Sequence, residues 1–218
     1  MIEMLIDMLV RVADLGGPVV LLLIALSVLT LAVMLYKIWQ FRAAGVGRHR
    51  ALKHAVAAWD AGDHGTARDA LARSSSYLKP VITMAFAGRC DAARLDAEAE
   101  TRFARLERGF RFLDSVAQLS PLLGLFGTVL GMISAFQALQ DAGAQVDPSI
   151  LAGGIWVALL TTAVGLAVAM PTALVLSWFE TRMEAERVLA EQALRSVLSP
   201  AGSTQAAETV AIGAPAHA

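Results

Sequence analysis

The sequence has few of the residues that build redox or metal chemistry. Its 218 residues include one cysteine, Cys90, so no disulfide can form within the chain. Four histidines, His49, His54, His64 and His217, are scattered without the spacing of metal ligands. We therefore expect no metal site and no cofactor.

Charge is also scarce, at 17% of the residues, whereas hydrophobic residues make up 56%. The mean hydropathy of +0.58 is too high for one soluble domain. The formal net charge of -1 gives no reason to expect nucleic-acid binding. These values favour a membrane protein.

Three long stretches contain no Asp, Glu, Lys, Arg or His. They run from Leu15 to Tyr36, from Ser115 to Gln140 and from Pro148 to Phe179. Each exceeds the roughly 20 residues that a helix needs to cross a bilayer, and a backbone in lipid must satisfy its hydrogen bonds within the segment. We therefore predict an all-α integral membrane protein with three transmembrane helices and long helical cytoplasmic extensions. The predicted spans are residues 15–38, 111–140 and 149–179.

Basic residues are distributed unevenly along the chain. Of 18 Lys and Arg residues, 14 lie between Lys37 and Arg111. Because positive side chains mark the cytoplasmic side of a membrane, we expect the N-terminus and the loop at 141–148 in the periplasm and the C-terminus in the cytoplasm. The protein is then a multi-pass protein of the cell inner membrane.

The segments outside the spans have their own patterns. Residues 1–14 are interpreted either as a periplasmic interfacial helix or as a simple extension of the first span. The cytoplasmic segments are a helical region at 39–110, a helix extension at 180–199 that ends near Leu198, and a flexible tail at 200–218.

Turn residues predict where the cytoplasmic helices break. Breaks are expected at Gly45–Gly47, at Gly62–Gly65, and around Ser74–Ser76 with Pro80. A last helix is expected to start near Asp91 and to continue straight into the second span.

The second and third spans differ from the first. The first has Leu, Val and Ile on all sides, which is typical of a helix that faces lipid. Small residues recur every three or four positions in the other two, which lets helices pack closely where lipid removes the hydrophobic drive. The small residues proposed to pack are Gly124, Gly127, Gly131, Ala158, Gly165 and Ala169.

Threonines lie deep within these two spans, at Thr128, Thr161 and Thr162. Each hydroxyl could simply bond a carbonyl one turn earlier in its own helix. Their place on or beside the small-residue faces also favours a polar inner surface. No span carries an Asp, Glu, Lys, Arg or His, the usual mark of a proton relay. If protons cross, a partner must supply the carboxylate.

Two motifs in these spans closely resemble the MotA/TolQ/ExbB proton channel family, and its ExbB and TolQ branch most of all. The first motif runs from Ser120 to Met132, as SPLLGLFGTVLGM, and the second from Gly154 to Pro171, as GIWVALLTTAVGLAVAMP. Span order and cytoplasmic charge extend the likeness more loosely from about residue 15 to residue 198.

The resemblance implies a homopentamer whose second and third helices line a pore. It further implies a pair of single-span partners of the ExbD/TolR type in the pore, each with a membrane aspartate, and a TonB-like or TolA-like protein that spans the periplasm. By position in the motifs, Thr128 and Thr162 match the family's pore-lining threonines, and Thr161 is their neighbour. Many ExbB and TolQ chains have a glutamate where this sequence has Val157, which puts a proton-carrying role of that helix in doubt.

Three functions remain open from the sequence. The leading one is an ExbB-like subunit of a proton-driven motor that energises TonB-dependent outer-membrane transport. A related alternative is a TolQ-like subunit of the Tol-Pal envelope and division system. An alternative of a different class is a membrane scaffold protein without ion flux. No nucleophile and base stand at motif spacing, so we predict no enzyme activity and interpret Cys90 as a structural thiol.

Overall fold

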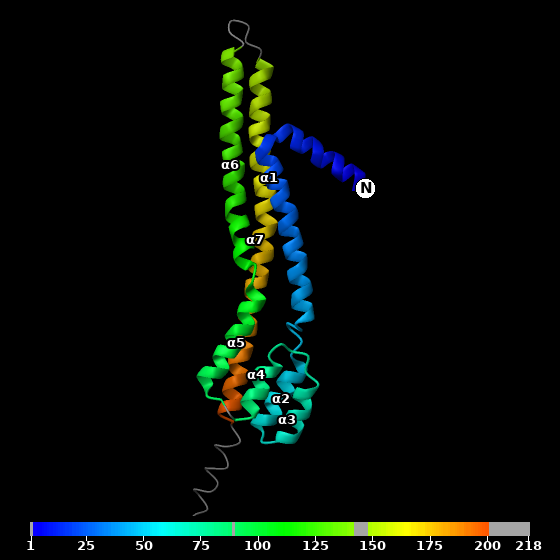
Figure 1. The fold of residues 1–218 in the computed structure, drawn as a ribbon, viewed down its shortest axis with the longest axis vertical. Helices are drawn as coiled ribbons and strands as arrows, with labels where there is room; N and C mark the ends of the chain where they lie inside the picture. The colour runs from blue at the N-terminus through cyan, green and yellow to red at the C-terminus, as the bar shows by residue number, and fades with distance from the viewer. Residues whose placement is uncertain (1, 89, 142–147, 201–218) are drawn as a thin grey trace, which may run out of the picture. The chain divides into compact units, whose positions relative to one another are not determined.

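The computed structural model describes residues 2–88, 90–141 and 148–200, with the side chains of 2–16 and 150 left undescribed. Within these ranges the chain is helical and has no strand, which confirms the predicted all-α class (Figure 1). The helices are α1 (Ile2–Ala43), α2 (Arg50–Asp60), α3 (His64–Ala72), α4 (Lys79–Phe86), α5 (Ala92–Glu107), α6 (Phe110–Asp141) and α7 (Pro148–Leu198). Most of the predicted 141–148 loop and of the predicted tail lies outside the described residues.

The chain divides into two compact units. The membrane unit comprises Met1–Tyr36 and Gly109–Phe179, and the polar unit comprises Lys37–Arg108 and Glu180–Ala218. Tyr36 and Phe179 are also the last residues of two uncharged stretches, so the division follows the charge pattern of the sequence. Among the described residues, three helical segments are long and apolar enough to cross a membrane: Gly17–Ala43, Phe110–Asp141 and Leu151–Leu198.

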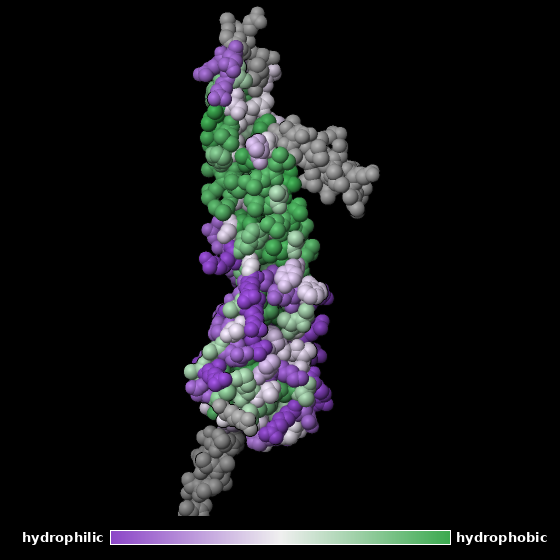
Figure 2. All heavy atoms as spheres, in the orientation of Figure 1, coloured by the Kyte–Doolittle hydropathy of each residue, from purple (hydrophilic) through white to green (hydrophobic). Residues whose placement is uncertain are grey.

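The outer surface of the membrane unit is hydrophobic. Figure 2 shows apolar side chains gathered over its helices, whereas the surface of the polar unit mixes hydrophilic and apolar side chains. Leu122 on α6 and Leu174 on α7 are 59% and 73% exposed. Such surfaces suit lipid or a neighbouring helix rather than water.

The first span has a buried face in addition to the exposed apolar side chains that are typical of a helix facing lipid. Val20, Leu23, Thr30 and Met34 are buried at helical spacing, while Leu21 and Leu22 remain exposed. The helix is also interrupted at Gly17, whose φ of 66° is outside the helical region. The sequence did not show this face because apolar residues occupy the exposed positions and, apart from Thr30, the buried positions named here.

The breaks between the short helices fall where the turn residues predict. Helix α1 ends at Ala43, before Gly45 and Gly47, both with positive φ, and a further break separates α2 from α3 at Gly62. Asp63 accepts a hydrogen bond from the backbone N–H of Thr66, and this cap holds the pKa of its carboxyl below the usual range.

The prediction that the helix after Asp91 continues straight into the second span is wrong. Helix α5 ends at Glu107 and α6 begins at Phe110. Gly109 between them has a φ of 93°, in the left-handed region that glycine adopts without a steric cost. The helical pattern of the flanking residues conceals this single break.

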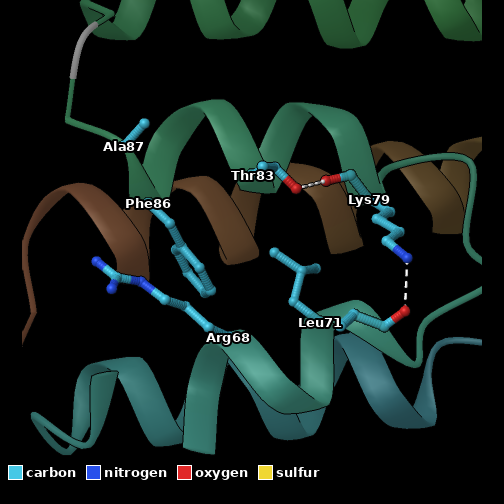
Figure 3. Close-up of a pocket in the computed structure, with 7 residues that line it drawn as sticks. Arg68, Leu71, Lys79, Thr83, Phe86 and Ala87 are labelled. Carbon is cyan, nitrogen blue, oxygen red and sulfur yellow. Dashed lines mark hydrogen bonds between the residues drawn. The ribbon is translucent and has the colours of Figure 1, made fainter. Parts of the chain in front are cut away.

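The core of the polar unit forms where its short helices pack together. Its fully buried side chains include Leu52 on α2 and Ile82 on α4. The ring of Trp59 stacks on Phe86 at 4.0 Å between centroids. A cavity of about 480 Å³ lies beside this stack, lined by Leu71, Phe86, Lys79 and neighbours from α3 and α4 (Figure 3).

Candidate functional site

Helices α6 and α7 meet along their small residues within the membrane unit. A Cβ placed on Gly165 would lie 2.6 Å from the carbonyl oxygen of Ser120 and 3.1 Å from the Cα of Gly124. A Cβ on Gly124 would lie 2.9 Å from the carbonyl oxygen of Thr161. Since real Cβ atoms do not come so close to backbone atoms, glycine is required at both positions.

The same contact continues toward the other end of the two helices. Gly127 faces Thr161, Gly131 faces Ala158, and the contact ends where Gly154 meets Ala135. Residue numbers rise along α6 as they fall along α7, which is the pattern of an antiparallel pair. Of the predicted packing residues, Gly124, Gly127, Gly131, Ala158 and Gly165 lie in this contact, and Ala169 is buried.

The three predicted threonines occupy different places. Thr161 is 1% exposed, and its hydroxyl donates to the carbonyl oxygens of Ala158 at 2.7 Å and, across the contact, of Gly124 at 3.2 Å. The hydroxyl of Thr128 donates to Leu125 O at 2.6 Å in its own helix, and Thr162 is half-buried. The bond to the preceding turn is thus present for Thr128 and Thr161, and their role in a proton path stays a prediction.

Sequence reasoning missed other polar groups in the membrane unit. Thr30 on α1 and Ser120 on α6 are 2% and 0% exposed, and neither hydroxyl has a hydrogen-bond partner among the described residues. Thr172 is buried as well and donates to Val168 O. The signal for Thr30 was a hydroxyl within a mostly aliphatic span, which also contains Ser27.

Val157, at the position where many relatives carry a glutamate, lines a crevice of about 340 Å³. It is also lined by Gly131 and Ala135 of α6, by Gly154 of α7, and by Pro18, which follows the interruption of α1 at Gly17. The crevice is built from small and apolar groups, so nothing ionisable points into it. No group of three potential metal-ligating side chains occurs among the described residues.

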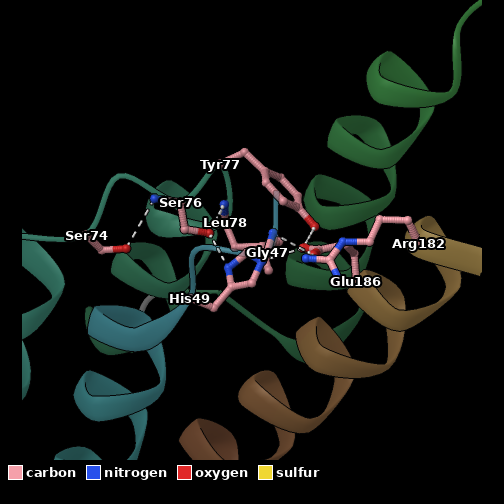
Figure 4. A network of polar contacts seen from close by, with 8 residues as sticks. All are labelled: Gly47, His49, Ser74, Ser76, Tyr77, Leu78, Arg182 and Glu186. Atoms are coloured by element: carbon pink, nitrogen blue, oxygen red, sulfur yellow. Dashed lines mark hydrogen bonds and ion pairs between the residues drawn. The ribbon is translucent and has the colours of Figure 1, made fainter. Parts of the chain in front are cut away.

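The polar unit contains a buried network around Glu186, which the sequence did not reveal (Figure 4). Glu186 is 3% exposed, and its Oε2 lies 2.6 Å from His49 Nε2 and 2.9 Å from the hydroxyl of Tyr77. Its Oε1 accepts the backbone N–H of Gly47 at 3.0 Å. The backbone N–H of Gly47 also donates to His49 Nε2 at 3.0 Å, and Ser76 Oγ lies 3.1 Å from His49 Nδ1.

The network changes the acidity of Tyr77. Burial, together with the charge of Glu186 and the hydrogen bond to it, raises the pKa of the Tyr77 hydroxyl far above its ordinary value of 10.0. The phenol therefore stays protonated and keeps donating to the carboxylate. The network joins the turn before α2 to the last part of α7, across 139 residues between Gly47 and Glu186.

A second set of ion pairs joins α7 to α5. The guanidinium of Arg187 contacts Glu100 at 2.6 Å and Glu107 at 2.7 Å, and it also lies 4.9 Å from the ring centre of Phe103. A bidentate cation stacked on an aromatic ring is held in one orientation. The polar unit thus holds the end of α7 on two sides.

Comparison with known proteins identifies the region that contains both motifs. Residues 89–192 match the MotA/TolQ/ExbB proton channel family. The chain is similar to the biopolymer transport protein exbB1 of Vibrio cholerae, with 46% identity over 63 residues, which cover 29% of this chain and 28% of that protein. It is also similar to the Tol-Pal system protein TolQ of Haemophilus influenzae, with 42% identity over 80 residues, which cover 37% of this chain and 35% of that protein.

A longer match includes more of the chain. It is to a putative biopolymer transport protein ExbB homolog of Methanothermobacter thermautotrophicus, with 33% identity over 132 residues, which cover 57% of this chain and 46% of that protein. The chain thus spans less than half the length of each of these curated relatives.

Proposed function

We propose that the chain is an ExbB-like pore-forming subunit of an inner-membrane proton-driven motor, on the basis that residues 89–192 match the MotA/TolQ/ExbB proton channel family. In this proposal the motor energises TonB-dependent transport across the outer membrane. The N-terminus lies in the periplasm and the C-terminus in the cytoplasm, as the distribution of basic residues favours.

The observation that carries the proposal is the α6–α7 contact, which contains both family motifs. Gly124 and Gly165 bring the two backbones together and make the pair a rigid wall element. The uncharged stretches of both helices carry no ionisable side chain. Such a wall supplies a surface for a proton path and leaves the proton-carrying group to another protein.

The partners follow from this division of roles. Five copies of the chain would surround a pair of ExbD-like or TolR-like single-span proteins, whose membrane aspartates carry the protons. A TonB-like or TolA-like protein would pass the resulting movement to the outer membrane. Thr128 and Thr162, with Thr161 beside them, are the residues proposed to contact the proton path.

Two other functions are kept as alternatives. The similarity to the Haemophilus influenzae protein TolQ favours a TolQ-like subunit of the Tol-Pal system to the same degree as the ExbB-like one. The scaffold alternative requires only that the small residues pack, which the α6–α7 contact within one chain also satisfies.

Mass measurement of the assembly purified from its native membrane tests the proposal. We expect several copies of the chain together with a small single-span protein that carries an aspartate in its span. Recovery of the chain without such a partner, under mild detergents that keep other membrane complexes intact, would contradict the motor and favour the scaffold.

Deletion of the chain in its own host separates the ExbB-like role from the TolQ-like role. An ExbB-like subunit predicts loss of uptake of iron chelates or cobalamin with an intact outer membrane. A TolQ-like subunit predicts leakage of periplasmic proteins and chained cells with uptake intact.

A further inference from the structure

A second cavity in the polar unit has an excess of positive charge. It has a volume of about 260 Å³ and lies between the start of α2 and the last third of α7. Arg50 and Lys53 of α2 line it from one side and Arg182 of α7 from the other. Three cations around one cavity repel one another unless an anion lies between them.

The single carboxylate at this cavity is already engaged. Glu186 receives His49, Tyr77 and the N–H of Gly47 at hydrogen-bonding distance, and it is 3% exposed. Its oxygen lies 3.8 Å from Arg182 Nη2, which is too long for a hydrogen bond. Glu186 therefore shapes the floor of the cavity and leaves the donors of Arg182 available.

The guanidinium of Arg182 lies against the backbone of Gly47. A Cβ on Gly47 would lie 1.7 Å from Arg182 Nη2, so the guanidinium rests against a glycine that has a φ of 82°. Figure 4 shows the side chain reaching from α7 toward Gly47 and Glu186. The side chain is 41% exposed, so a ligand in the cavity can reach its donors.

Arg182 has Glu186 as a distant counter-ion at 3.8 Å, whereas the two cations of α2 have none among the described residues. Arg50 and Lys53 are three residues apart in the first turn and form no ion pair or hydrogen bond of their side chains with the described residues. That first turn contains no acidic residue, and no side chain caps it. The positive end of the helix dipole adds to the positive potential of the three side chains.

The larger cavity beside α3 and α4 lacks this character. Its lysine, Lys79, donates to the carbonyl oxygen of Ala72 at 2.6 Å, and Leu71 and Phe86 make much of its lining apolar (Figure 3). Arg68 is the other cation of that lining, whereas the cavity at Arg182 has two cations, Arg50 and Lys53, that form no ion pair with the described residues.

We propose that the cavity formed by Arg50, Lys53 and Arg182 binds a phosphate group. Guanidinium forks match phosphate oxygens in pairs, and lysine adds a point charge. The volume is sufficient, since one water takes about 30 Å³ of liquid. Either a soluble phosphate or the headgroup of an anionic lipid presents this chemistry. The proposal is independent of proton conduction.

The test uses the full chain in nanodiscs and has two arms. In the first, the nanodiscs contain phosphatidylcholine alone, and inorganic pyrophosphate is titrated calorimetrically. In the second, they contain phosphatidylcholine and phosphatidylglycerol, and the phosphatidylglycerol retained by the protein is measured by native mass spectrometry. Binding in the first arm identifies a soluble ligand, and binding only in the second identifies a lipid headgroup.

Two triple variants decide whether the cavity is the site. Arg50→Gln/Lys53→Gln/Arg182→Gln should weaken binding at least about tenfold, because a hydrogen bond to a charged group is worth that much or more. Arg68→Gln/Arg73→Gln/Arg94→Gln removes the same charge from exposed positions of the same unit and should leave binding within about twofold. The helical circular dichroism of both variants is measured first.

Three results would overturn the proposal. They are the absence of saturable binding in both arms, an affinity of the cavity variant within twofold of the unmodified chain, and an equal loss in the control variant.

Discussion

Single glycines set the distance between α6 and α7. Gly165→Ala would place a methyl group 2.6 Å from the carbonyl oxygen of Ser120, so the helices must separate. We expect this variant to lose about 1–3 kcal/mol of stability, the usual cost of overpacking. Thermal unfolding of the purified protein, followed by circular dichroism, measures the loss.

Gly153→Ala is the matched control for this prediction. It makes the same change in the same helix, where a Cβ meets nothing within 4 Å. We expect its stability to be unchanged or slightly higher, because alanine favours helix. Equal unfolding temperatures for the two variants would show that close approach at Gly165 does not hold the pair together.

The hydroxyl of Tyr77 makes the stability of the polar unit dependent on alkaline pH. Its pKa is raised by burial and by Glu186, so the folded chain keeps a proton that the unfolded chain loses above about pH 10. The Tyr77 hydroxyl therefore makes its full contribution to the stability of the folded chain below pH 10, and this contribution falls as the pH rises further. We expect the difference in unfolding temperature between the unmodified protein and Tyr77→Phe to shrink from pH 8 to pH 11.

Other titrating groups act equally in both proteins and cancel in that difference. A constant difference across the pH range would mean that the Tyr77 hydroxyl is no better held in the folded state than in the unfolded chain. Helical circular dichroism during heating is the measurement.

The joint between α5 and α6 depends on the left-handed backbone of Gly109. A side chain at a φ of 93° costs about 1–2 kcal/mol. We therefore expect Gly109→Ala to destabilise the protein, although alanine is the better helix former. The unfolding temperature of the reconstituted variant, compared with that of the unmodified chain, shows whether the substitution destabilises or stabilises the protein.

Gly65→Ala serves as the comparison, because Gly65 lies within α3 and its Cβ would have only an ordinary contact with Asp63 at 3.6 Å. This variant should be more stable by about 0.5–1 kcal/mol. Stabilisation by both substitutions would indicate that α5 and α6 form one continuous helix, as the sequence pattern suggested.

The elements that the sequence predicted correctly are those with a repeated signal. Long uncharged stretches marked the spans, and small residues at three- and four-residue steps marked the α6–α7 contact. The break at Gly109 was missed because one residue carries it. The network of Glu186 was missed because its partners lie 109 and 139 residues away, at Tyr77 and Gly47, and no local pattern links them.

In the proposed function the whole molecule supplies the wall of a proton path, and its three uncharged stretches carry no Asp, Glu, Lys, Arg or His. Liposomes that contain this chain alone should therefore show no more proton flux than empty liposomes, because no such side chain lies in those stretches. Flux should appear when a single-span partner with a membrane aspartate is added. Flux from the chain alone would contradict the proposed division of roles.

The pore threonines can be tested in the same assembled liposomes. Thr162→Val keeps the shape of a half-buried side chain and removes its hydroxyl, so we expect about a tenfold loss of flux if that hydroxyl contacts the proton path. Thr172→Val makes the same change at a buried position of α7 whose hydroxyl already donates to Val168 O. It should affect stability more than flux. Unchanged flux in Thr162→Val would show that this hydroxyl has no part in conduction, whereas equal losses in both variants would trace the effect to helix stability.

Val157→Glu, measured beside them, tests whether a carboxylate in the crevice that Val157 lines raises flux.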